Sequence, residues 1–171
     1  MAAIVNAVLG NIVRQADCDA IVNSANPNLR AGSGVCGAIY RAAGPELEPY
    51  STRLAPLPLA QAVVTPGFLL PNRLIIHCRG PRYLFDPNPP SQLALCLENT
   101  LKLAEAEGVR RVAVPAISMG VYAYPPAEAV PILVATACRM APSFNHLEEI
   151  RFVVTDPALL ERFQNAISAS T

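Results

Sequence analysis

The sequence predicts an α/β protein in three layers, with a mixed, mostly parallel central sheet covered by helices on both faces. Three observations lead to this fold class. Short apolar segments alternate with longer segments of helical periodicity, which is typical of parallel strands joined by helices. Hydrophobic residues make up 52% of the chain and charged residues 15%, which is enough apolar material for a core and excludes a disordered chain. The length of 171 residues fits one domain, so we expect residues 1–171 to form a single domain.

Six short apolar runs are expected to be the strands of the sheet. Strands interleaved with helices imply a sheet whose strands are mostly parallel. The expected strands are Ala3–Leu9, Asp19–Val22, Gln61–Thr65, Arg73–Cys78, Arg111–Pro115 and Glu149–Thr155.

Four segments are expected to be helices: Gly34–Ala43, Ser91–Glu107, Pro126–Met140 and Pro157–Ser168. The first is followed by Gly44-Pro45, which stops a helix. The second has leucines at helical spacing, with Ser91 as the expected N-cap and Gly108 directly after its end. The last begins with a proline close to its first position, where proline is tolerated.

Two other segments are expected to lie outside the helices. Leu54–Asn72 carries no charge over 19 residues, but it contains four prolines that would break a membrane-spanning helix. We therefore expect a loop and a strand there. Arg79–Pro90, which also holds four prolines, is expected to be a surface loop.

Composition and charge exclude several classes of partner. The formal net charge is zero, so we expect no nucleic-acid and no membrane partner. None of the five cysteines forms a C-x-x-C pair, so we expect no metal site and no cofactor, only mostly buried free thiols in a reducing cytoplasm. A single lysine among thirteen basic residues hints at a GC-rich bacterial genome.

Two segments have the composition of anion-binding loops. Asn23–Gly37 and Pro115–Tyr124 each leave an expected strand and lead toward a helix, and both contain glycine. In open α/β sheets, ligands bind where such loops meet at the carboxyl ends of strands. Glycine lets backbone N–H groups approach an anion, and the helix N-terminus adds a favourable dipole. Two facing loops of this kind are suited to clamp a diphosphate.

Residues Gly32–Gly37 also match the dinucleotide-binding pattern G-x-G-x-x-G. That pattern normally follows its strand directly and is completed by an acidic residue about 20 positions later, which binds a ribose. Here nine residues separate strand and pattern, and no acid occurs between Glu48 and Asp86. A conventional dinucleotide-binding enzyme is therefore disfavoured.

Successive blocks of the chain resemble those of a macrodomain, most closely of the bacterial and MacroD-type branch. The blocks are Leu9–Ile12, Asp19–Asn26, Gly34–Val35, Ile39–Pro45 and Pro115–Tyr122. The resemblance implies binding of ADP-ribose and, in many members, its removal from proteins or deacetylation of O-acetyl-ADP-ribose. It also implies ligand contacts from Asn11, Ile12, Ala25, Asn26, Gly32, Ser33, Gly34, Val35, Ser118, Met119, Gly120, Val121 and Tyr122.

The resemblance assigns roles within this set. Asn26 would hold the distal ribose, and Tyr122 would lie against it. Gly32–Val35 and Ser118–Tyr122 would enclose the phosphates, and Asn11 with Ile12 would bind adenine. The sequence departs from the family pattern at Asn11 and Cys36, each usually aspartate, and at Ser33, Met119, Ala123 and Thr155, usually glycine, threonine, glycine and an aromatic residue.

The departure at Cys36 bears on catalysis, because related hydrolases have a catalytic aspartate there. A cysteine near a helix N-terminus could ionise and act as a nucleophile if a histidine base were near. The sequence offers His77, at the end of an expected strand, and His146, in a polar loop where solvation is expected. A Cys–His pair is the minority hypothesis.

Three functions remain open from sequence. The first is an ADP-ribose-binding module with weak or no hydrolase activity, because Cys36 replaces the aspartate; its partner is ADP-ribose or an ADP-ribosylated protein. The second is an active mono-ADP-ribosyl hydrolase or O-acetyl-ADP-ribose deacetylase, in which a water activated by the substrate attacks; Asn26 and Cys36 are the candidate catalytic residues. The third is the disfavoured dinucleotide enzyme.

Overall fold

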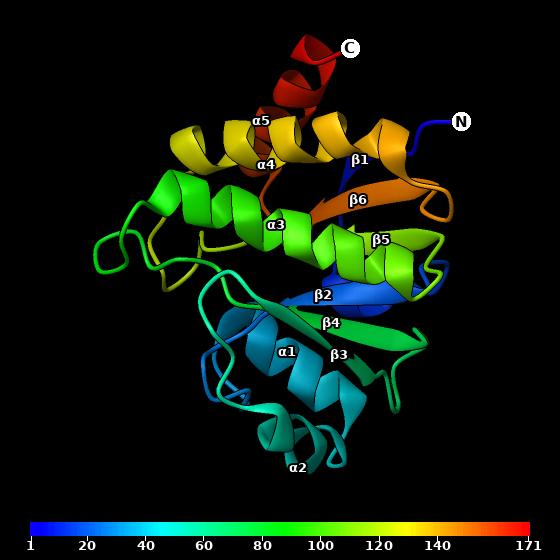
Figure 1. The fold of residues 1–171 in the computed structure, drawn as a ribbon, viewed down its shortest axis with the longest axis vertical. Helices are drawn as coiled ribbons and strands as arrows, with labels where there is room; N and C mark the ends of the chain where they lie inside the picture. Colours follow the sequence, from blue (N-terminus) through cyan, green and yellow to red (C-terminus); the bar gives the residue numbers. More distant parts are fainter.

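The computed structural model describes all 171 residues, and its centre is one six-stranded sheet (Figure 1). The strand order is β1-β6-β5-β2-β4-β3, and every neighbouring pair is parallel except β3 and β4. The mixed, mostly parallel sheet predicted from sequence is therefore confirmed. The strands are β1 (Ile4–Leu9), β2 (Ala20–Ser24), β3 (Ala62–Pro66), β4 (Leu74–Cys78), β5 (Arg111–Val114) and β6 (Glu149–Val154).

Helices cover both faces of the sheet. In Figure 1, α1 and α2 lie on one side of the strands, and α3 and α4 lie on the other. The helices are α1 (Gly34–Ala43), α2 (Leu47–Ser51), α3 (Pro89–Ala106), α4 (Pro126–Met140) and α5 (Pro157–Ala169), with 3₁₀ turns η1 (Ile12–Arg14), η2 (Thr52–Leu54) and η3 (Ala141–Ser143). The predicted three-layer arrangement is confirmed.

Alternation along the strands explains why both faces need a cover. Successive side chains of a strand point to opposite faces. Val22 and Ile76 belong to the larger core cluster under α3, α4 and α5, whereas their neighbours Ile21 and Ile75 belong to the cluster under α1. Because both faces of the central strands are apolar, the sheet is stable only between two helical layers.

Two of the four predicted helices, α1 and α4, have the bounds seen in the structure, and the bounds of α3 and α5 differ from the predicted ones by one or two residues. Helix α4 continues through Pro131 without ending. Ser91 is not an N-cap, because α3 begins two residues earlier, at Pro89, after Asn88 in a left-handed conformation. Proline fits the first helical position because it has no N–H to leave unsatisfied there.

The short helix α2 has no counterpart in the sequence prediction. It has five residues, too few for helical periodicity to be recognised. The uncharged segment 54–72 contains β3 flanked by loops, as predicted. None of the helices combines the length and the apolar composition that a membrane span requires.

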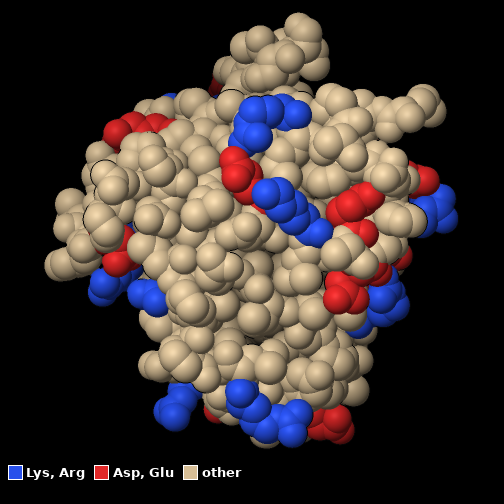
Figure 2. Space-filling model, viewed as in Figure 1, with Lys and Arg blue, Asp and Glu red and all other residues tan.

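Charged side chains do not gather by sign on the face shown in Figure 2, where basic and acidic groups are interspersed. Four of the five cysteines are buried and all five are free thiols, as predicted.

Candidate functional site

A cavity of about 310 Å³ opens between the segments that follow β2 and β5. These two strands are parallel neighbours at the centre of the sheet, so their carboxyl ends meet at one edge. Chain segments diverge from such an edge in doubly wound sheets, which leaves space for a ligand. The cavity is lined by Ser24, Ala25, Asn26, Gly32, Ser33, Gly34, Val35, Cys36, Pro115, Ala116, Ser118, Gly120, Val121 and Tyr122.

Most residues predicted to contact ligand therefore line one cavity, together with Cys36. Asn11, Ile12 and Met119 do not line it. The sequence analysis did not select Ser24, Pro115 and Ala116, which also line it. Their positions at the ends of β2 and β5 could have identified them, because the first residues after parallel strands face the ligand edge.

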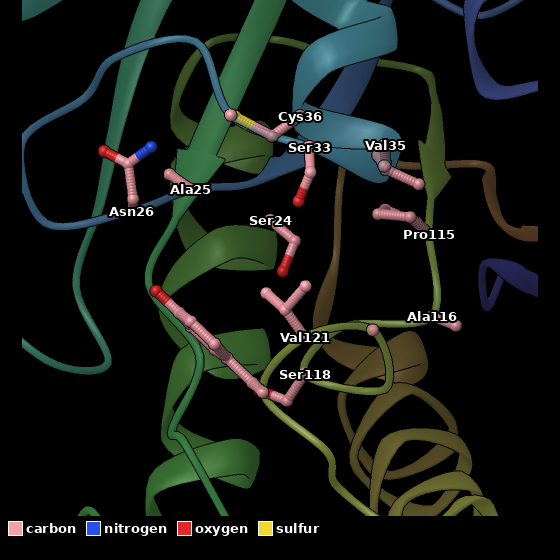
Figure 3. A pocket seen from close by; sticks show the side chains of 14 residues that line it. Ser24, Ala25, Asn26, Ser33, Val35, Cys36, Pro115, Ala116, Ser118 and Val121 are labelled. Atoms are coloured by element: carbon pink, nitrogen blue, oxygen red, sulfur yellow. The ribbon is translucent and has the colours of Figure 1, made fainter.

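Different residues line the two ends of the cavity. Figure 3 shows Asn26 and Cys36 at one end and Val35 and Pro115 at the other. The side chains of Ser24 and Ser33 project between these ends. Ser33 is the N-cap residue of α1, but its hydroxyl makes no capping hydrogen bond. That hydroxyl and the first N–H groups of α1 are therefore available to an anion.

The side chain of Asn26 closes the first loop on itself. Its Nδ2 donates to the carbonyl oxygen of Arg30 at 2.7 Å, and its Oδ1 accepts from the Arg30 N–H at 3.2 Å. Each of these amide atoms can still take part in one further hydrogen bond, since Nδ2 has two hydrogens and Oδ1 has two lone pairs. Asn26 can thus shape the loop and contact a ligand together.

Side chains of helices α1 and α2 hold the first loop, residues 23–37, in place. Leu29 is buried with a φ of 52°, which is strained for a residue with a branched side chain. Its carbonyl oxygen accepts hydrogen bonds from the Tyr40 hydroxyl at 3.0 Å and from the Ser51 hydroxyl at 2.7 Å. The Glu48 carboxylate accepts from the Ala31 N–H at 2.7 Å. Contacts with α1 and α2 therefore stabilise one conformation of the first loop.

Ser118 is the most unusual residue of the second loop. It has a φ of 66°, it is 3% exposed, and its Oγ has no hydrogen-bond partner. Its backbone carbonyl accepts from the Tyr124 N–H at 2.9 Å, which closes the loop. A buried hydroxyl without a partner is costly unless a ligand or water satisfies it.

The thiol of Cys36 is a neutral, packed group. The residue is 7% exposed, and burial raises the pKa of its thiol above the usual value. Sγ donates to the Arg30 carbonyl oxygen at 3.5 Å and accepts from Nδ2 of Asn23 at 3.7 Å. These surroundings therefore favour a neutral thiol over a thiolate with a lowered pKa at the helix N-terminus.

His77 cannot serve Cys36 as a base. Nδ2 of Asn23 donates to Nδ1 of His77 at 3.0 Å, so Nε2 carries the ring proton and donates to Thr65 Oγ1 at 2.9 Å. Burial lowers the pKa of His77 to about 3, so the ring is neutral at pH 7. Both ring nitrogens are occupied, and the amide of Asn23 separates the ring from the thiol. His146, the other histidine, is exposed, as predicted.

Asn11 and Ile12 lie at the same edge of the sheet but beyond the cavity lining. The Asn11 Oδ1 accepts from the Val13 N–H at 3.1 Å and caps η1, and Ile12 is buried in the core under α1. Thr155 follows β6 and is exposed. Since β6 is separated from β2 by β5, Thr155 lies roughly 10 Å farther along the sheet than the Asn26 end.

The fold and the site define a three-layer α/β/α module with one cavity between two glycine-containing loops. No group of three or more metal-ligating side chains accompanies the cavity. The Macro domain family model matches residues 22–133, which include both loops, and the chain belongs to this family.

Relatives of known sequence and structure agree with this assignment. A Macro domain-containing protein of Ralstonia nicotianae is 45% identical over 86% of this chain and 87% of its own length. A protein of Klebsiella pneumoniae named O-acetyl-ADP-ribose deacetylase is 41% identical over 87% of each chain. The Oceanobacillus iheyensis macrodomain solved with ADP superposes with a TM-score of 0.90 and 33% identity, over 95% of this chain and 89% of that one. A mutant form of that macrodomain has been solved with ADPR.

Proposed function

We propose that this macrodomain binds ADP-ribose in the cavity between its two loops. The observation that carries the proposal is the enclosure of one cavity by the N-terminus of α1 and by the loop that holds the unpartnered Ser118 hydroxyl. An elongated diphosphate ester would accept hydrogen bonds from the first N–H groups of α1 and lie against the second loop. The Oceanobacillus iheyensis macrodomain, solved with ADP and as a mutant with ADPR, supports the same ligand class.

The two ends of the cavity suit the two ends of this ligand. The diphosphate would lie between residues 32–35 and 118–122, where backbone N–H groups and the α1 dipole favour an anion. The distal ribose would lie at the end formed by Asn26, Cys36 and Tyr122. Adenine would extend past Val35 and Pro115 toward Asn11 and Ile12. Asn11 accepts from adenine without a charge, so this contact is weaker than one from aspartate.

We further propose that hydrolase activity is weak or absent. Cys36 occupies the distal-ribose end as a neutral thiol whose pKa is raised by burial. A neutral thiol cannot deprotonate a water molecule. Unlike a carboxylate, it also lacks a second acceptor atom that could form a bridging hydrogen bond to that water. The physiological partner would then be an ADP-ribosylated protein, which this macrodomain binds without removing the ADP-ribosyl group. The buried free thiols fit a reducing compartment, and we place the protein in the cytoplasm.

A second candidate function is removal of ADP-ribose from proteins or deacetylation of O-acetyl-ADP-ribose. The observation in its favour is the 41% identity to the Klebsiella pneumoniae protein named O-acetyl-ADP-ribose deacetylase. Without a protein base, a substrate phosphate would have to activate the water, with Asn26 positioning the distal ribose. Ester leaving groups need little acid assistance, so such a reaction does not require an aspartate.

Calorimetric titration with ADP-ribose, AMP and NAD tests the binding proposal. We expect ADP-ribose to bind best, with micromolar or weaker affinity, equivalent to about −8 kcal/mol or less in magnitude. Absence of heat with millimolar ADP-ribose would refute the proposal. Tighter binding of NAD would instead favour a dinucleotide-dependent enzyme.

A further inference from the structure

Three large hydrophobic side chains lie exposed on the second loop and on the segment hydrogen-bonded to it. Leu84 is 73% exposed and Phe85 is 76% exposed, on the segment that follows β4. Val121, which lines the cavity from the second loop, is 82% exposed. We call Leu84, Phe85 and Val121 the rim surface.

The turn that carries Leu84 and Phe85 is held firmly. The Asp86 carboxylate accepts from the Arg82 N–H at 2.7 Å and from the Arg82 guanidinium at 3.1 and 3.2 Å. The N–H groups of Phe85 and Asp86 donate to the Arg82 carbonyl oxygen at 3.1 and 3.0 Å. The guanidinium carbon lies 5.4 Å from the Phe85 ring centroid. The two side chains are thus presented to solvent by an ordered turn.

The same turn is joined to the wall of the cavity. The Tyr83 N–H donates to the Tyr122 carbonyl oxygen at 3.0 Å. The Tyr83 ring packs against Tyr124 with centroids 4.8 Å apart, and its hydroxyl donates to the Glu128 carboxylate at 3.0 Å. Because Tyr122 lines the distal-ribose end, the rim surface has a fixed position relative to the atom through which ADP-ribose is attached to a protein.

Of the rim surface, only Val121 lines the cavity, so free ADP-ribose, a polar dianion, would leave Leu84 and Phe85 without a partner. Exposed hydrophobic side chains on a fixed support mark a contact with another molecule. Arg82 is neutralised by Asp86, so the rim surface offers apolar contact and little charge. These features fit a polypeptide with apolar side chains beside its modified residue.

We propose that the rim surface binds the polypeptide that carries the ADP-ribosyl group. The inference rests on the proposed function, since it places the modified chain where the distal ribose leaves the cavity. The protein would then prefer ADP-ribose attached within an apolar segment to free ADP-ribose. Specificity for the target would come from Leu84 and Phe85, outside the nucleotide site.

The test uses two synthetic peptides that carry ADP-ribose on one side chain through a hydrolysis-resistant amide, one flanked by leucines and one by serines. We expect the parent to bind the leucine peptide about tenfold or more tightly than free ADP-ribose or the serine peptide. The double variant Leu84→Ser/Phe85→Ser should lose this preference and bind free ADP-ribose like the parent. Leu69→Ser is the matched control, because Leu69 is 76% exposed but packs at the far end of α1, beside Gly44.

The outcomes separate this inference from the proposed function. If the parent binds both peptides and free ADP-ribose equally, the inference fails and the proposed function stands. If free ADP-ribose does not bind, the proposed function fails. Equal weakening of all three ligands in the double variant overturns the inference, because the surface would then belong to the nucleotide site. It is also overturned if sedimentation shows that the parent dimerises through this surface and the double variant does not.

Discussion

Gly80 and Ser118 face each other so closely that a Cβ on residue 80 would overlap the Ser118 hydroxyl oxygen. Gly80 follows β4 and Ser118 lies in the second loop, so the position of that loop depends on the absence of a side chain at residue 80. The same Cβ would lie 2.8 Å from Cγ2 of Ile117, so rotation of the Ser118 hydroxyl alone would not make room for it.

We therefore expect Gly80→Ala to displace the second loop and weaken ADP-ribose binding by about tenfold, or 1.4 kcal/mol. Calorimetry measures the affinity, and thermal melting shows whether the variant remains folded. A folded Gly80→Ala protein with the affinity of the parent would mean that the second loop does not set the binding energy.

Substitution of Gly120 tests whether the ligand lies close to the backbone of the second loop, because this substitution should not impair folding. A Cβ at residue 120 would meet no protein atom within 4 Å, although Gly120 lines the cavity. Gly120→Ala should therefore change the free energy of unfolding by less than about 0.5 kcal/mol. If a phosphate approaches this backbone, the same methyl group should reduce ADP-ribose affinity several-fold in calorimetry. Unchanged affinity would place the phosphates elsewhere.

Gly34 differs from Gly120 because it needs glycine for its own conformation. Its φ is 58°, which disfavours any side chain, and a branched one most. Gly34→Val should therefore lose about 1 kcal/mol or more of stability in urea unfolding and also block the ligand. Loss of stability with intact affinity would show that the residue serves only the start of α1.

Asn26→Ala should weaken ADP-ribose binding by roughly 1–3 kcal/mol, because it removes hydrogen bonds to the distal ribose. It also removes both hydrogen bonds to Arg30, which close the first loop. Calorimetry with AMP provides the control, since AMP has no distal ribose. If the substitution weakens the binding of AMP as much as that of ADP-ribose, its main effect is on the conformation of the first loop. If a folded variant binds ADP-ribose like the parent, Asn26 makes no contact with it.

The fold and most of the lining could be predicted because both depend on local sequence. Strand and helix periodicity predicted the order of the elements, and glycine-containing segments after two strands predicted the cavity. The contacts of Asn23 and Leu29 could not be predicted in this way, because their partners are distant in the sequence. Leu29 is held by Ser51, 22 residues away on a helix too short to predict, and the amide of Asn23 contacts His77 across 54 residues. From the sequence, the segment after β4 was predicted only to be a surface loop. Its position beside the second loop could not be predicted, because that position depends on the order of the strands in the sheet.

The pH dependence of stability should reveal the burial of His77. Its pKa is about 3 in the folded protein and 6.5 when exposed, so the unfolded state binds a proton more readily. The contribution to stability is complete above pH 6.5 and falls as the pH drops toward 3, by roughly 5 kcal/mol in all. Urea unfolding between pH 7.5 and 4.5 should show a falling free energy of unfolding. His77→Gln, which does not titrate, should have a flatter profile in this interval; an identical slope in both proteins would contradict the assignment.

The chemical state of Cys36 makes a separate prediction. Since burial raises the pKa of its thiol, alkylation by iodoacetamide at pH 7 should be slow and should accelerate above pH 9. Mass spectrometry of peptides containing Cys36 and the less buried Cys138 compares the two rates within one protein. Rapid modification of Cys36 at pH 7 would indicate a thiolate and revive nucleophilic catalysis.

Cys36→Asp should raise the rate at which ADP-ribose is released from acidic side chains. A carboxylate at this end of the cavity could accept a proton from water and could also accept the hydrogen bond that Asn23 now donates to Sγ. General-base assistance typically contributes about 10²-fold or more, and we expect a gain near the lower end because the new carboxylate is partly desolvated. A time course of release from a mono-ADP-ribosylated protein compares the parent, Cys36→Asp and Cys36→Ala. The parent and Cys36→Ala should be similarly slow. A fast parent that Cys36→Ala inactivates would make the thiol catalytic, whereas a fast parent that tolerates Cys36→Ala would favour water attack assisted by the substrate phosphate.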